Sequence, residues 1–348
     1  MLNRRQMMMG LAALAAGPAC SRPDDPLTRA AEWLWTQQDP ATGLFGSRTV
    51  GLLSSGQSLT PFALLALAEV PELFRPEAAG RALAACLAAL DDGALGFRGG
   101  APDYPTYATA LLLSALARLR PRHVAVEGKP LADWLLRTQF GQDWAGHPAE
   151  GGFGMGSKER PQPPESGHVD LSMTRRALEG LAAYGAPNPG AALAFVARCQ
   201  TADGSFLYSP VEMALNKGER SGDSSSGYGS ATTDGVLALA ACGLPGEDPK
   251  IVKALDYLRG VHRVDRNPGV PPEMGDFATA MRGYYRAGAA QVFRRFGGPG
   301  GWQTALRDAV LAEQRPEGFW QNESPLQKEN DPIVATSFAI LALTAAQS

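Results

Sequence analysis

A short phrase that recurs along the chain constrains its fold more than any other feature. The clearest copy is Gln314–Trp320, Q-R-P-E-G-F-W, which predicts a glutamine at a helix end, a turn, a glycine and an aromatic residue. Looser copies begin at Gln38, Leu90, Gln139 and Gln200. Recurrence of this kind is typical of an architecture built from similar stacked units. The sequence therefore predicts a repeat fold before any single side chain is interpreted.

A second phrase follows each copy, and it consists of a threonine within a run rich in alanine and leucine. Six such runs align on Thr60, Thr109, Thr174, Thr233, Thr279 and Thr336. Four runs are apolar on nearly every side, as buried helices are, whereas the helices before the glutamine phrases have a single apolar stripe. The predicted inner helices span 60–70, 105–119, 171–184, 233–242, 277–296 and 332–346, and they alternate with six half-exposed outer helices. Two concentric rings of helices follow from this alternation.

Composition favours one domain and excludes one class of partner. The chain of 348 residues is long enough for two average domains, but no linker divides it and the repeats run from end to end. Residues 21–348 are therefore expected to form a single domain. The net charge is −3, and no basic cluster follows the first few residues. A chain with this charge distribution has no basic surface that would bind nucleic acid.

Residues 1–20 predict an export signal rather than part of the fold. Paired arginines, Arg4 and Arg5, precede a short apolar run that ends in small residues and Cys20. This pattern suits a twin-arginine signal, and Sec export fits it as well. Cys20 is a candidate lipidated first residue of a bacterial lipoprotein, and the apolar run is too short to span a bilayer. We expect the protein in the bacterial envelope, either in the periplasm or attached to the membrane through a lipid anchor.

The connections between the predicted helices have unequal lengths. Those from an inner to an outer helix are mostly short, whereas three from an outer to an inner helix span residues 140–169, 201–232 and 262–276. Structureless connections beyond about 15 residues are uncommon in compact domains unless they serve a site or are disordered. In an alternating ring, every outer-to-inner connection lies at the end where the inner helices begin. We call that end the mouth and expect the ligand there.

Acidic and aromatic side chains gather near the predicted starts of the inner helices. The acidic residues are Asp103, Asp170, Asp234, Asp276 and Asp331. Aspartate is a preferred N-cap, so helix capping accounts for each of them singly. Several carboxylates around one narrow opening would instead raise the pKa of one of them or attract a cation. Core packing and the lining of a pocket for apolar or cationic ligands are both open for five tyrosines, Tyr104, Tyr107, Tyr228, Tyr284 and Tyr285.

The glutamine phrases and the six helix pairs resemble the terpenoid cyclase and protein prenyltransferase superfamily over nearly the whole chain after residue 20. The resemblance is greatest to bacterial prenyltransferase/squalene oxidase repeat proteins, through segments that begin at Ser226 (S-G-Y-G-S-A-T-T-D-G) and Glu329 (E-N-D-P-I-V-A-T). It implies an all-α fold, an α6/α6 toroid with an inner and an outer ring. An apolar or isoprenoid-like ligand in the centre of the ring is also implied. Because one fold hosts many activities, no particular reaction follows from it.

Within this superfamily, squalene–hopene-type cyclases protonate an alkene with the middle aspartate of a D-x-D-D-T motif. The nearest match here begins at Asp170 (D-L-S-M-T), and Ser172 occupies the position of the proton donor. A serine hydroxyl is too weak an acid to replace a carboxylic acid in that step. The sequence therefore predicts a squalene-cyclase-like protein that does not cyclise by this mechanism.

The zinc chemistry of the superfamily has no counterpart in this sequence. Protein prenyltransferases bind Zn²⁺ through an aspartate, a cysteine two residues later and a distant histidine. No cysteine of this chain follows an aspartate at that spacing, and only His168 among the four histidines is expected at the mouth. We therefore expect no metal site and no cofactor.

The leading hypothesis is an exported toroid that binds an apolar small molecule or lipid. Its candidate ligand-binding residues are Tyr107, His168, Tyr228, Asp276, Tyr284 and Glu329. One alternative is a cyclase-like enzyme that uses an inner-helix aspartate, with Asp170, Asp234 and Asp331 as candidates. A second is a polysaccharide-active enzyme with a pair of carboxylates. A third is a module that binds another protein through its long loops.

Overall fold

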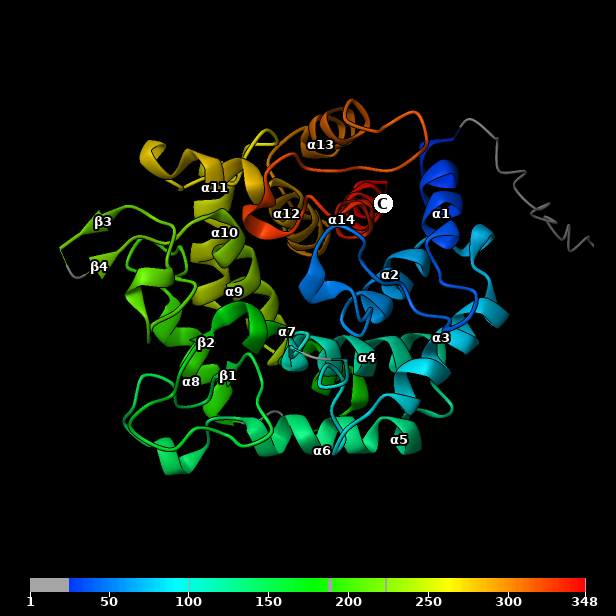
Figure 1. The fold of residues 1–348 in the computed structure, drawn as a ribbon. Coiled ribbons are helices and arrows are strands. Elements are labelled where there is room, and N and C mark those ends of the chain that lie inside the picture. The colour runs from blue at the N-terminus through cyan, green and yellow to red at the C-terminus, as the bar shows by residue number, and fades with distance from the viewer. Residues whose placement is uncertain (1–24, 100, 187–189, 223, 348) are drawn as a thin grey trace, which may run out of the picture.

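Six inner helices form a closed ring (Figure 1). The computed structural model describes residues 25–99, 101–186, 190–222 and 224–347. The inner helices are α2 (Leu59–Leu67), α4 (Pro105–Leu119), α7 (Leu171–Tyr184), α9 (Gly229–Ala241), α12 (Arg282–Phe296) and α14 (Pro332–Ala345). Each one packs against the next, and α14 packs against α2. The ring is therefore continuous.

Six outer helices surround this ring and confirm the predicted all-α toroid (Figure 1). They are α1 (Pro26–Thr36), α3 (Pro76–Ala88), α6 (Lys129–Thr138), α8 (Gly190–Cys199), α10 (Pro249–Val261) and α13 (Trp302–Leu311). The connections contain two short α-helices, α5 (Val124–Glu127) and α11 (Gly275–Ala280). They also contain two antiparallel strand pairs, β1 (Phe153–Gly154) with β2 (Val169–Asp170), and β3 (Arg220–Ser221) with β4 (Ser224–Ser225).

The glutamine of the repeated phrase joins one repeat to the next. In the last copy, the side-chain amide of Gln314 donates to the carbonyl of Gly318 at 2.9 Å and to that of Pro26 in α1 at 2.8 Å. Two other copies form the same pair of bonds, Gln38 with Gly43 and Ala78, and Gln200 with Gly204 and Lys250. The phrase recurs because each outer helix has to be attached to the turn before it.

The glycine of the phrase is required by its backbone and by its neighbour. Gly318 has a φ of +101°, and a Cβ atom there would lie 2.7 Å from the carbonyl oxygen of Arg29. Gly204 has a φ of +92°, and its Cβ would lie 2.5 Å from the carbonyl oxygen of Lys253. Glycine alone adopts this left-handed conformation at little cost and leaves room for the adjacent helix.

The threonine of the second phrase holds the turn against the inner helix. In five repeats its hydroxyl oxygen accepts the backbone N–H of the residue that ends the turn, with distances of 2.9–3.0 Å. The pairs are Thr60 with Phe45, Thr109 with Leu95, Thr174 with Phe153, Thr232 with Phe206 and Thr336 with Trp320. The alignment on Thr233 was one residue too late, because Thr232 makes this bond. Thr279 does not align either, since it is exposed on α11.

The fifth inner helix differs from its prediction over 277–296. It is broken at Met281, with α11 ending at Ala280 and α12 beginning at Arg282. The carboxylate of Glu329 accepts the first-turn N–H groups of Gly283 and Tyr284, both at 2.8 Å. Since this cap comes from a distant segment, the local pattern of apolar residues could not indicate where α12 begins.

Candidate ligand-binding cavity

A cavity of about 370 Å³ lies at the N-terminal ends of the inner helices. Every inner helix contributes side chains from its first turns to the wall. Most of these side chains are apolar or aromatic, among them Leu59, Phe62, Leu111, Met173, Val334 and Phe338. The cavity therefore occupies the mouth and is lined mainly by hydrocarbon.

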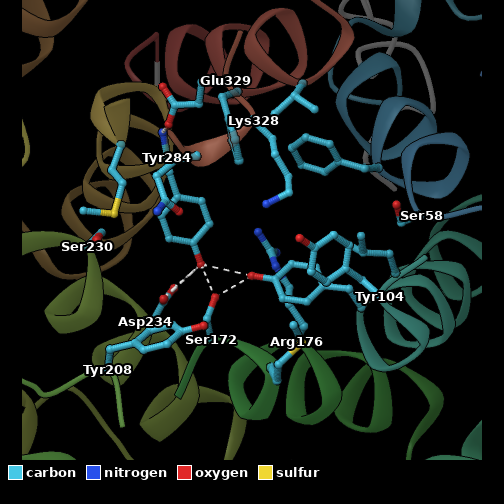
Figure 2. Close-up of a pocket in the computed structure, with 18 of the residues that line it drawn as sticks. Ser58, Tyr104, Ser172, Arg176, Tyr208, Ser230, Asp234, Tyr284, Lys328 and Glu329 are labelled. Atoms are coloured by element: carbon cyan, nitrogen blue, oxygen red, sulfur yellow. Dashed lines mark hydrogen bonds between the residues drawn. The ribbon is translucent and has the colours of Figure 1, made fainter. Parts of the chain in front are cut away.

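A chain of hydrogen-bonded hydroxyl groups crosses one wall of the cavity (Figure 2). The Tyr284 hydroxyl donates to both carboxylate oxygens of Asp234 at 2.9 Å. Because a phenol has one hydrogen, Tyr284 accepts from Ser172 in the 2.6 Å bond between their hydroxyl groups. Ser172 in turn accepts from the hydroxyl of Tyr107. Ser172 is thus the middle member of a network of hydroxyl groups.

Asp234 is buried beside a cation, with an exposed fraction of 2%. One guanidinium nitrogen of Arg175 lies 2.8 Å from Asp234, and the Nε of Arg175 lies 2.8 Å from Glu179. Burial raises the pKa of Asp234, and the charge of Arg175 opposes that rise. Asp234 lies inside α9 rather than at its start, because α9 begins at Gly229. Its carboxylate is therefore an ion-paired hydrogen-bond acceptor.

Asp170 caps α7 and holds a histidine at the cavity. One carboxylate oxygen accepts the N–H of Met173 at 2.8 Å, and the other lies 2.7 Å from Nε2 of His168. The same nitrogen lies 3.1 Å from the hydroxyl of Tyr208. The hydrogen bond with Asp170 raises the pKa of His168. His168 and Tyr208 line the cavity, whereas Asp170 is completely buried behind them.

The other acidic candidates occupy three different settings. Asp331 caps α14 by accepting the N–H groups of Ile333 at 2.9 Å and Val334 at 3.0 Å, and it does not line the cavity. Asp276 is exposed on α11 and also lies outside the lining. Glu329 does line the cavity, and burial raises its pKa to about 7.

The three candidate tyrosines meet at the cavity, as Tyr107, Tyr228 and Tyr284 all line it. Burial raises the pKa of each of these phenols. They are therefore neutral hydroxyl groups at physiological pH.

Sequence reasoning missed two basic residues of the lining, Arg176 and Lys328. The guanidinium carbon of Arg176 lies 6.0 Å from the ring centroid of Tyr107. Nζ of Lys328 lies 5.4 Å from the ring centroid of Tyr104. The sequence did contain a signal for Arg176, because Arg175 and Arg176 are adjacent inside a largely apolar inner helix. The sequence contained no signal for Lys328, because this residue lies in a loop and adopts a left-handed conformation with a φ of +63°.

The described residues offer neither a cluster of metal ligands nor a membrane span. They contain no group of three or more His, Cys, Asp or Glu side chains arranged to hold a metal ion. No helix within them is long and apolar enough to cross a bilayer. The predicted export signal and Cys20 lie outside the described residues.

Comparisons with solved structures support the fold. A protein from Actinoplanes superposes with a TM-score of 0.57 and 18% identity, over 93% of this chain and 99% of the other. A variant of the type II terpene cyclase MstE from Scytonema, in complex with geranylgeranyl dihydroxybenzoate, gives a TM-score of 0.57 and 15% identity over 92% and 96% of the two chains. A glycosidase variant in complex with glucose gives 0.54 and 12% over 94% and 99%.

At these identities the likeness defines the fold alone, an α/α toroid of the kind that type II terpene cyclases and this glycosidase have. No protein-family model matches the sequence, and a search of curated proteins gave no match.

Proposed function

We propose that the protein binds an apolar, isoprenoid-like molecule in its central cavity without cyclising it. The lining of the cavity carries this proposal, since aliphatic and aromatic side chains from all six inner helices surround about 370 Å³. That volume lies within the range of about 300–1,000 Å³ typical of small-molecule sites. The geranylgeranyl compound bound by MstE, which shares the fold, supports an isoprenoid as the class of ligand.

The setting of the carboxylates favours binding over cyclisation. Protonation of an alkene needs a strong carboxylic acid that is free to donate. Asp170 and Asp331 serve as helix caps, and Asp234 accepts from Arg175 and Tyr284. Glu329 accepts two backbone N–H groups, and its raised pKa makes it a weaker acid than an ordinary carboxyl group. Ser172, at the position that the resemblance assigns to the proton donor, has no carboxyl group.

The same settings disfavour glycoside hydrolysis. That reaction uses two carboxyl groups on either side of the scissile bond, one of which protonates the leaving group. The two acidic residues that line the cavity are Asp234 and Glu329. Both are already bonded to donors of the protein, so the cavity presents no free carboxyl pair.

The binding proposal is tested by titrating the purified protein with geranylgeraniol in a calorimeter. We expect saturable binding to one site with a negative heat-capacity change, because apolar surface is buried. A parallel incubation with squalene and geranylgeraniol, separated by gas chromatography with mass detection, should return both compounds unchanged. A product with the same mass and a new retention time would establish the cyclase alternative instead.

A matched pair of variants locates the binding. Val334 lines the cavity and is 8% exposed, so Val334→Trp should fill the space and abolish binding. Val252 is 41% exposed on α10, so Val252→Trp should bind as the unmodified protein does. Circular dichroism checks that both variants are folded. Equal binding by the two variants, or no binding by the unmodified protein, would overturn the proposal. Capture of a partner protein in the latter case would favour the interaction module.

We also propose export to the bacterial envelope, on the N-terminal sequence alone. Arg4 and Arg5 match a twin-arginine signal, and Cys20 matches the lipidated residue of a lipoprotein. Expression in a bacterial host followed by fractionation should place the protein in the envelope. The double substitution Arg4→Lys with Arg5→Lys should retain it in the cytoplasm. Cys20→Ala should release it from the membrane fraction if the anchor is present, and a cytoplasmic unmodified protein would contradict export.

A further inference from the structure

Two basic side chains extend into the cavity from opposite walls (Figure 2). Lys328 comes from the loop before α14, and Arg176 comes from α7. Nζ of Lys328 lies over the ring of Tyr104, and Lys328 forms no ion pair with any residue that the structure describes. Lys328 is half-buried, and a half-buried cation without a counter-ion is unusual in a cavity lined by hydrocarbon.

Arg176 is only partly satisfied. Its Nη1 lies 3.0 Å from Glu179, and its side chain is 12% exposed. Its Nε is buried and has no hydrogen-bond partner in the described parts of the chain. Buried donors in folded proteins nearly always have a partner. Only Nη1 of Arg176 forms a bond within the described residues, so its guanidinium group, which lines the cavity, retains unused donors.

The nearby carboxylates leave Lys328 without a counter-ion. Asp234 and Glu179 share Arg175 between them, and Glu179 also bonds to Arg176. The two oxygens of Glu329 face the first-turn N–H groups of α12. The two carboxylates, Asp234 and Glu179, thus pair with the two arginines, Arg175 and Arg176. Glu329 is bonded to the start of α12, so the charge of Lys328 has no anion beside it.

We propose that Lys328 and Arg176 form an anion subsite, and that the natural ligand is an amphiphile with an isoprenoid-like tail and an anionic headgroup. A carboxylate and a phosphate both provide the oxygen acceptors that a guanidinium and an ammonium bind. The proposal rests on the proposed function, because the tail is assigned to the apolar part of the same cavity. It adds the chemistry of the head, which the apolar lining alone does not specify.

The test compares three probes with one tail: geranylgeraniol, geranylgeranoic acid and geranylgeranyl phosphate. Calorimetric titrations at pH 8 and low salt give the Kd of each. A charge-assisted hydrogen bond corresponds to about a tenfold change in affinity or more. We therefore expect at least one anionic probe to bind about tenfold more tightly than the alcohol, and the tighter of the two identifies the headgroup.

Substitutions assign the preference to the two cations. Lys328→Gln and Arg176→Gln should each weaken the anionic probe about tenfold and change the alcohol less than about twofold. Arg176→Lys should retain part of the preference, because it keeps the charge. Lys217→Gln and Arg198→Gln are matched controls, since these cations lie over Phe277 and Phe195 and do not line the cavity. Both controls should leave all three affinities unchanged.

The outcomes separate this inference from the proposed function. Binding of the alcohol with no gain for either anion would overturn the anion subsite alone. Equal weakening of alcohol and anion by Lys328→Gln and Arg176→Gln would assign the two residues a structural role and would also overturn it. Failure of all three probes to bind would overturn both proposals.

Discussion

The side-chain amide of Gln314 donates to the carbonyl of Pro26 at 2.8 Å, which bonds the sixth repeat to the first. Oε1 of Gln314 accepts from the guanidinium group of Arg29. Trp33 and Phe319 stack across the same junction with ring centroids 4.9 Å apart. The ring thus closes through the same glutamine bond that joins earlier repeats, and closure needs no special element.

Removing this glutamine should weaken the closed ring. Gln314→Ala deletes the bonds to Pro26 and Gly318, and we expect the free energy of unfolding to fall by on the order of 2 kcal/mol. Urea denaturation followed by circular dichroism measures the change. Gln162→Ala is the control, because Gln162 is exposed and its loss should change stability by less than about 0.5 kcal/mol. An unchanged midpoint for Gln314→Ala would show that the bonds of this glutamine contribute nothing to stability.

The threonine bonds predict a second loss of stability. Thr336→Val keeps the shape of the side chain but leaves the buried N–H of Trp320 without its acceptor at 3.0 Å. A buried unsatisfied donor costs about 1–3 kcal/mol, so denaturation should require correspondingly less urea. Thr344→Val on the same helix is the control, because the Thr344 hydroxyl only bonds to carbonyls of its own helix. Equal effects of the two substitutions would contradict the role assigned to Thr336.

Glu329 predicts a pH dependence of stability. Its pKa is about 7 in the folded protein against 4.5 for an ordinary glutamate. Between pH 4.5 and pH 7, Glu329 is therefore more often protonated in the folded state than in the unfolded state. The free energy of unfolding should therefore fall as pH rises from 4.5 to 7, by about 3 kcal/mol in total. Glu329→Gln should flatten that part of the curve. Urea midpoints at pH 5, 6, 7 and 8 test it.

The exposed residue Glu323 lies in the same loop and supplies the control for this measurement. Glu323→Gln should retain the full pH dependence of the unmodified protein. A curve that stays steep in Glu329→Gln would assign the titration to another group.

The ion pair of Asp234 predicts a non-additive effect. Asp234→Leu leaves Arg175 and the Tyr284 hydroxyl without their shared acceptor, and we expect a loss of about 3 kcal/mol. The double variant Asp234→Leu with Arg175→Met should recover part of that loss, because the uncompensated charge is also removed. Asp256→Leu is the control, since Asp256 pairs with Arg259 on the surface at 3.5 Å and should contribute at most about 1 kcal/mol. A double variant less stable than Asp234→Leu would contradict this account.

The sequence predicted the rings because the determinants of the fold are local and repeated. The glutamine, the glycine and the threonine of each repeat make bonds with defined partners, so their spacing is visible as a pattern. The start of α9 was missed because its cap comes from elsewhere, with the side chain of Asn267 accepting the N–H of Ser230 at 2.9 Å. Patterns within a segment contain no information about a cap that another segment supplies.

The candidate site was less predictable for the same reason. Tyr107, Tyr228 and Tyr284 were found because they lie on or next to inner helices at the mouth. Lys328 and Tyr208 lie in connections, where only the folded path of the loop brings them to the cavity. Asp276 was assigned to the mouth from the predicted helix 277–296, and the break at Met281 places it on the exposed surface instead.

A closed ring with all its inner helices parallel collects six positive helix ends on one rim. Each end is equivalent to about half an elementary charge, so the rim would carry a substantial positive potential if nothing opposed it. Asp170 and Asp331 accept the first-turn N–H groups of α7 and α14, and Glu329 does so for α12. Asp170 and Asp331, which resemble catalytic acids in the sequence, therefore supply counter-charge to two of these helix ends whatever the chemistry of the toroid.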